Sequence, residues 1–268
     1  MVAMKKAYLF SLSLVLVVVV GAFRGSDPQR RTPNESFGPG EVLRYRVHYG
    51  FINAGEAEVK VSNQIHKVNE RPCYEVTAFG RSVGAFDWVI RIRDTWKSYI
   101  DTSALVPQRF QTNVQEGKYR KEETVHFNYH DRMIRSEEKN ETTKQFEMPK
   151  GVQDIISGYC YLRTIDFSQL RVNETVPIPA FFDDKLYDFK IRYRGKEEVS
   201  TKFGKIRCIR IAPVMPKNEM FDGEGSIRVW ITDDKNRIPV KIEADMFVGS
   251  IAMDLKDFKG LKQKPAFQ

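Results

Sequence analysis

The sequence has few cysteines and histidines, three and four in 268 residues, and neither type is arranged as a metal site. No two of Cys73, Cys160 and Cys208 are close in sequence, which excludes the C-x-x-C signatures of redox and zinc proteins. His126 and His130 are four residues apart, but no glutamate follows His126 and the segment alternates like a strand. We therefore expect three buried structural cysteines, although one disulfide is an open alternative, and we predict no metal and no cofactor.

A dense basic cluster is also lacking, although lysine and arginine exceed aspartate and glutamate by 43 to 35. The basic residues are scattered along the chain among acidic ones, unlike the basic stripe of a nucleic-acid-binding protein. Nucleic acid is therefore not an expected partner. An excess of positive charge suits an acidic surface, such as phospholipid or lipopolysaccharide head groups, or simply reflects solvated strand faces.

The N-terminus has the three parts of a secretory signal. Lys5 and Lys6 precede an uncharged, apolar run over residues 7–23, and small residues at Gly21 and Ala22 provide an exit. We predict a signal peptide over residues 1–22 and a periplasmic or otherwise extracytoplasmic location, with no transmembrane span after cleavage. An uncleaved anchor is the alternative, but the run is short for a span of roughly 20 apolar residues.

The rest of the chain reads as a tether followed by strands. Residues 23–39 are rich in Gly, Pro, Asn and Arg, a composition that cannot build a core, and we predict a disordered tether. From residue 40 to 260, apolar and polar residues alternate in short runs bounded by Gly, Asn, Asp or Pro, including residues 86–92. We predict an all-β, mainly antiparallel domain: a long curved meander, or two packed half-barrels (40–150 and 170–260).

One segment breaks this alternation. Ile155, Ile156, Tyr159 and Cys160 recur at helical spacing, and Asp154 is suited to cap the N-terminus. We predict one helix near residues 153–165, joining the two halves.

One segment of the sequence matches a known catalytic motif. Gly80-Arg81-Ser82-Val83-Gly84 matches the G-x-S-x-G nucleophile elbow, which requires a strand before the serine and a helix after it. Because residues 86–92 read as another strand, a glycine-rich turn is the favoured interpretation. Acid pairs such as those at Asp183 and Asp233 lie at expected turns. We therefore assign no catalytic residues.

Aromatic residues outside the expected core give the best binding candidates. Exposed apolar clusters commonly line a cleft or contact a partner. The ligand-binding residues that we predict, at the rim of a groove, are Phe181, Phe182, Met220, Phe221 and Trp88.

Several motifs in order along the chain resemble a family of bacterial exported proteins, the domain-of-unknown-function family 3108. The matching motifs are Gly40-Glu41-Val42-Leu43-x-Tyr45, Gly50-x-x-x-Ala54-Gly55-x-Ala57, Asp154-x-x-Ser157, Tyr161-x-Arg163 and Trp230-Ile231-Thr232-Asp233-Asp234 with Pro239. The resemblance implies a β-rich envelope protein with no assigned activity and no catalytic residues to carry over. Residues 230–242 are also similar to the end of lipoprotein-carrier half-barrels, which hold an acyl chain or a peptide.

Together these features favour a non-enzymatic exported envelope protein that binds an apolar or amphipathic ligand, or a partner protein. The expected partners are a lipid or glycolipid, or another envelope protein. One alternative is a hydrolase of envelope glycan or lipid that uses Ser82 or turn acids. Another is a structural module of an outer-membrane complex.

Overall fold

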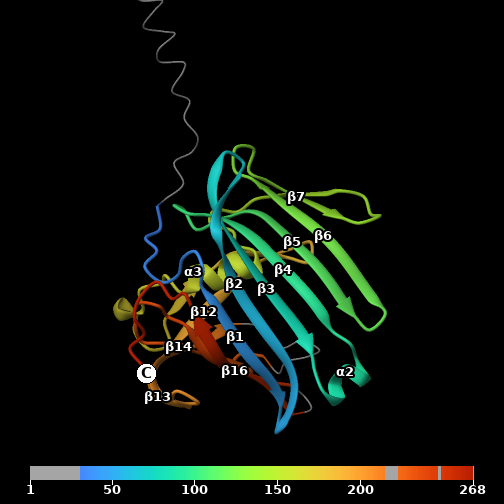
Figure 1. Ribbon diagram of the computed structural model, residues 1–268. Helices are drawn as coiled ribbons and strands as arrows, with labels where there is room; N and C mark the ends of the chain where they lie inside the picture. Colours follow the sequence, from blue (N-terminus) through green and yellow to red (C-terminus); the bar gives the residue numbers. More distant parts are fainter. Residues whose placement is uncertain (1–30, 215–222, 247–248, 268) are drawn as a thin grey trace, which may run out of the picture. The chain divides into compact units, whose positions relative to one another are not determined.

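The computed structural model describes residues 31–214, 223–246 and 249–267, and these are mainly β-structure (Figure 1). The first eight strands are β1 (Val42–Tyr49), β2 (Ile52–Val68), β3 (Arg71–Ser82), β4 (Arg93–Asp101), β5 (Pro107–Glu116), β6 (Tyr119–Asn128), β7 (Met133–Glu138) and β8 (Lys144–Glu147). The others are β9 (Thr175–Pro177), β10 (Ala180–Phe182), β11 (Lys185–Tyr187), β12 (Lys190–Thr201), β13 (Gly204–Val214), β14 (Ile227–Thr232), β15 (Pro239–Asp245) and β16 (Ser250–Lys259). The helices are α2 (Ala85–Val89), α3 (Ile155–Leu162) and the short 3-10 helix η1 (Phe167–Gln169). None of the helices in these ranges combines the length and apolar composition needed to cross a membrane.

Fourteen of the strands form one curved antiparallel sheet, which confirms the predicted fold class. The strand order is β8-β7-β6-β5-β4-β3-β2-β1-β16-β15-β14-β13-β12-β9, so most strands pair with their neighbours in sequence. Two pairs are exceptions: β9 pairs with β12 at one edge, and in the middle of the sheet the first strand, β1, pairs with β16. Strands β10 and β11 form a separate hairpin.

The predicted helix is confirmed as α3, and its start follows from the sequence as expected. The side chain of Asp154 accepts hydrogen bonds from the backbone N–H groups of Ile156 and Ser157, and Ser157 Oγ accepts from the Asp154 N–H. This capping box satisfies donors that a buried helix end would otherwise leave unpaired. One core cluster joins the helix to strands β2–β7, with members that include Val76, Phe110 and Cys160.

The strand predicted over residues 86–92 is wrong in its first part, because residues 85–89 form helix α2. Gly84 precedes the helix with φ at +57°, a conformation that glycine adopts without the steric penalty of a Cβ atom. The chain therefore leaves β3 in a tight turn and starts a short helix. The apparent alternation of Phe86 and Trp88 does not reflect two faces of a sheet.

A buried ion pair ties three distant segments together. Arg163 follows α3 and donates two hydrogen bonds to the Glu41 carboxylate, at 2.5 Å and 2.9 Å, with both side chains 1% exposed. The same guanidinium donates to the backbone carbonyls of Ser36 and Asn236. Burial acts to lower the pKa of Arg163, but the Glu41 carboxylate outweighs it and raises the pKa above its ordinary value.

Packing begins before Gly40, within the segment predicted as a tether. Phe37 is completely buried and joins the core cluster that contains α3, and its ring contacts Tyr74 edge-on. Upstream, Thr32 N–H donates to the carbonyl of Ser103. The predicted signal peptide lies outside the described residues. The three cysteines are free and buried, as expected.

Candidate functional site

A group of exposed apolar side chains gathers where two chain reversals of the sheet meet. We call Phe51, Ile52, Trp88, Val89 and Ile90 the apolar tip. Phe51 is fully exposed, Trp88 is 93% exposed and Val89 is 84% exposed, and the remaining two are also exposed. At such exposure these side chains contribute little to the core. A cluster of exposed apolar side chains commonly marks a site that contacts a partner.

The β1–β2 turn and α2 are held against each other by backbone and ring contacts. Val83 N–H donates to the carbonyl of Ala54 at 3.0 Å, and the rings of Tyr49 and Phe86 lie 6.3 Å apart between centroids. These contacts place Phe51 and Trp88 on neighbouring loops at the same end of strands β1–β3. The apolar tip is therefore made of two adjoining segments whose side chains project into solvent.

Ser82, the serine of the G-x-S-x-G motif, fixes the start of α2. Its Oγ donates to Asp87 at 2.5 Å and accepts from the Ile92 N–H at 2.9 Å, and Arg93 donates to the same carboxylate at 2.7 Å. The Arg93 guanidinium and the Ser82 hydroxyl hold the pKa of Asp87 at about 2, so this carboxylate is a poor general base. None of the hydrogen bonds made by histidines in the described ranges reaches Ser82. The motif thus acts as a turn that orients the tip.

We expect Ser82→Ala to lower the free energy of unfolding by about 1 kcal/mol, because the partly buried Ile92 N–H loses its acceptor. Urea denaturation followed by circular dichroism would measure this. Ser168→Ala, which removes an exposed hydroxyl bonded to Asp166, is the matched control and should change stability much less. Equal effects of the two substitutions would show that the Ser82 network does not support the turn.

The other predicted binding residues are not at the apolar tip. Phe181 is 1% exposed and packs on Phe127 and Phe146, with ring centroids 6.5 Å and 5.0 Å away. Phe182, the next residue of β10, points outward and is 42% exposed. Met220 and Phe221 lie outside the described residues. Of the predicted set, the structure places Trp88 at the apolar tip, and it places Phe182 on the β10–β11 hairpin together with the exposed Leu186 and Tyr187.

The turn acids are engaged in separate ion pairs. Asp183 lies on the β10–β11 turn, and its Oδ1 is 2.8 Å from Lys121 Nζ. Asp233 Oδ1 is 2.8 Å from Lys196 Nζ. In the ranges that the structure describes, no three His, Cys, Asp or Glu side chains converge in a way that could hold a metal ion.

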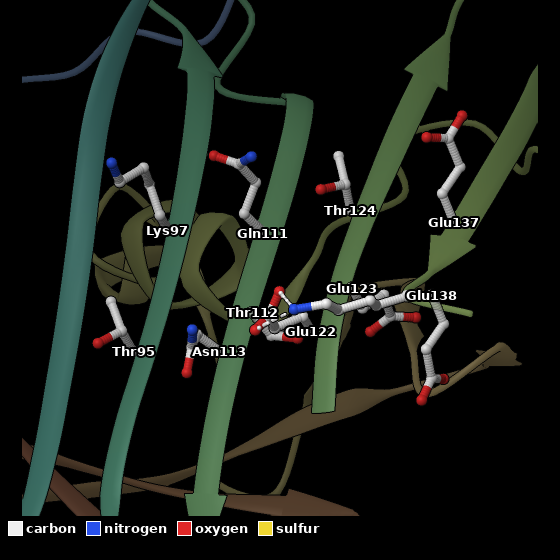
Figure 2. Close-up of a pocket in the computed structure, with 11 residues that line it drawn as sticks. Thr95, Lys97, Gln111, Thr112, Asn113, Glu122, Glu123, Thr124, Glu137 and Glu138 are labelled. Atoms are coloured by element: carbon white, nitrogen blue, oxygen red, sulfur yellow. Dashed lines mark hydrogen bonds and ion pairs between the residues drawn. The ribbon is translucent and has the colours of Figure 1, made fainter. Parts of the chain in front are cut away.

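A polar hollow of about 530 Å³ lies across strands β4–β7 (Figure 2). Thr95, Lys97, Gln111 and Thr124 are on the face opposite Ser98, whose hydroxyl contacts Asp154 at the start of α3. Lys139 Nζ donates to Glu122 at 3.0 Å. The lining offers hydrogen-bonding groups but no aromatic side chain, so it has the character of a solvated strand face.

Comparison with known proteins gives one matching family and several solved structures that resemble the fold. The sequence model of the family described as "Protein of unknown function (DUF3108)" matches residues 44–256. No curated protein matches the chain. The beta-barrel-like DUF1849 protein of Brucella abortus has a similar fold, with a TM-score of 0.54 at 12% identity over 82% of this chain and 97% of that one.

Two other solved structures align over most of their length with lower scores. The protein CT021 of Chlamydia trachomatis has a TM-score of 0.38 at 7% identity, covering 87% of this chain and 92% of that one. A Bacteroides fragilis protein described as exported, with a YmcC-like fold, has a TM-score of 0.33 at 11% identity, covering 87% and 100%.

Proposed function

The chain belongs to the DUF3108 family, and from that premise we propose that it is a non-enzymatic, extracytoplasmic envelope protein that binds an amphipathic partner through the apolar tip. The observation that carries this proposal is the exposure of Phe51 and Trp88 on two adjoining loops. The extracytoplasmic location rests on the signal-like pattern of residues 1–22.

The physical argument is one of unsatisfied apolar area. Burying a side chain such as Phe or Leu contributes about 1.5–3 kcal/mol to the free energy of binding. The apolar tip has five large apolar side chains that a partner could bury. The loops that carry them are fixed to the sheet by the Val83–Ala54 hydrogen bond and by the Ser82 network. Less conformational entropy is then lost on binding than a flexible loop would lose.

The hydrolase alternative receives less support from the same geometry. Ser82 donates to a carboxylate whose pKa is about 2, and Asp183 and Asp233 are each paired with a lysine. A general base needs a pKa near the working pH and hydrogen-bond reach to the nucleophile. The role as a binding protein therefore fits the site better.

Micelles of lysophosphatidylcholine, an amphiphile without net charge, would test the proposal. We expect the tryptophan emission of the protein to shift to shorter wavelength on titration, because Trp88 enters an apolar environment. Trp88→Phe should abolish the shift, since Trp230 is already buried and Trp96 is partly buried against the core. Phe51→Ser should weaken binding by at least about tenfold, the equivalent of the apolar burial it removes.

Val172→Ser and Tyr187→Ser are the matched controls, because both side chains are exposed and lie away from the β1–β2 turn and α2. Both should bind micelles like the unmodified protein. If the emission does not shift, or if the control variants lose binding as much as Phe51→Ser, the apolar tip is not the binding surface.

A further inference from the structure

A third loop borders the apolar tip and adds basic residues to it. Gly117, in the β5–β6 turn, donates its N–H to the carbonyl of Arg91 at 2.9 Å, and its backbone lies against the side chain of Ile90. Ile92 and Glu116 form a further backbone bridge. The turn therefore carries Lys118, Tyr119 and Arg120 to the end of the sheet where α2 lies. Tyr119 is 56% exposed and extends the apolar tip.

We call Arg91, Lys118 and Arg120 the basic collar. All three are exposed, and none forms an ion pair with a residue in the described ranges. The Arg120 guanidinium donates only to the backbone carbonyls of Gly117 and Tyr119. Their positive charge is therefore available to a ligand.

The nearby carboxylates have other close partners. Asp87 is paired with Arg93. Glu116 lies beside Asp94, and burial together with that neighbouring carboxylate raises the pKa of Glu116. The three side chains of the basic collar therefore have no direct ion-pair partner among the described residues.

We propose that the partner of the apolar tip is the surface of a lipid bilayer with anionic phospholipid head groups; this rests on the function proposed above. Aromatic side chains are favoured at the membrane–water interface, where an apolar ring meets polar head groups. Basic side chains near an anionic membrane each strengthen binding about fivefold. In this chain the aromatic groups project from one end of the sheet, and the basic groups lie beside α2 and on the β5–β6 turn, an arrangement that suits insertion into a head-group layer. A groove for a single ligand would instead enclose its apolar groups.

Vesicle co-sedimentation tests this inference with the full protein. One set of vesicles contains phosphatidylcholine alone, and the other contains phosphatidylglycerol mixed with phosphatidylcholine. We expect strong binding to the anionic vesicles only, weakened by added salt because exposed charges are screened. The triple variant R91Q/K118Q/R120Q should bind the anionic vesicles about a hundredfold more weakly.

The matched control is K150Q/R171Q/K205Q, which removes three exposed basic side chains from other parts of the chain and lowers the net charge equally. It should bind almost as well as the unmodified protein, and thermal unfolding should show that both triple variants remain folded. If the two triple variants lose binding equally, net charge and not the basic collar is responsible, and the inference is overturned.

The remaining outcomes separate this inference from the proposed function. Equal binding to both vesicle compositions would overturn the proposal that the partner is an anionic bilayer. Binding to lysophosphatidylcholine micelles without binding to any vesicle would do the same. In either case the proposal that the apolar tip binds an amphipathic partner would stand. Absence of binding to micelles and to both vesicle types would overturn both proposals.

Discussion

We expect Glu41→Gln to lower the free energy of unfolding by about 3–5 kcal/mol, because it leaves the Arg163 guanidinium buried without its counter-charge. The effect should exceed that of any single surface substitution, since Arg163 cannot discard its proton or reach water from its position among Phe37, Tyr159 and the carbonyl of Asn236. Urea denaturation followed by tryptophan fluorescence would measure the loss.

A double-mutant cycle with Arg163→Met provides the control. Arg163→Met should also be strongly destabilising, since Glu41 then becomes the unpaired buried charge. The double variant Glu41→Gln/Arg163→Met should be more stable than the sum of the two single changes predicts, because neither charge is left alone. Additive effects would show that the two side chains do not act as a pair. Lys256→Gln, which removes an exposed ion pair with Glu56, should cost at most about 1 kcal/mol.

A second large effect concerns the pH dependence of stability through Asp154. This carboxyl is fully buried, and burial raises its pKa to about 6 from an ordinary 3.8, against the opposing effect of hydrogen bonds from Ser98 and from the Ser157 and Ile156 N–H groups. The folded state therefore binds a proton more tightly than the unfolded chain. Stability from this group is present below about pH 4 and is lost as pH rises to about 6, in total by about 3 kcal/mol.

Comparison with Asp154→Asn would isolate this contribution. Asparagine also caps helices, so the variant should keep α3 but lack the titration. The stability of the unmodified protein relative to Asp154→Asn should fall by about 3 kcal/mol between pH 4 and pH 7. A constant difference across that range would mean that Asp154 titrates near its ordinary pKa. Asp154→Ala should destabilise the protein at every pH, because the Ile156 and Ser157 N–H groups lose their acceptor.

The sequence was informative where one local rule decides the structure. Alternation predicted the antiparallel sheet, and the helical spacing after Asp154 predicted α3, because burial periodicity is a local property. Helix α2 was missed because its five residues are too short to show a period. Over so few residues, the spacing of Phe86 and Trp88 is compatible with a helical turn as well as with a strand. Gly84 was the available signal for a turn before α2, since glycine readily adopts the left-handed backbone conformation found there.

The site was less predictable because it depends on contacts between distant segments. Trp88 was named from its residue type, but Phe51 was not, and nothing local shows that the β1–β2 turn and α2 adjoin. Phe181 and Phe182 are neighbours in sequence, and only the register of β10 decides which of them is buried. Glu41 and Arg163 both occur in the motifs of the family resemblance, yet their pairing across the fold is a tertiary fact.

The place of β1 beside β16 sets the order in which the protein can fold. Among the strands of this sheet, β1 is synthesised first and β16 last, so the centre of the sheet cannot form until β16 has been made. Until then, one edge of β1 presents unpaired N–H and C=O groups along eight residues, the kind of edge that invites pairing with another chain. Contacts between such distant segments also slow folding. The pairing of β1 with β16 is therefore the step that joins two runs of strands, each of which pairs mostly between sequence neighbours.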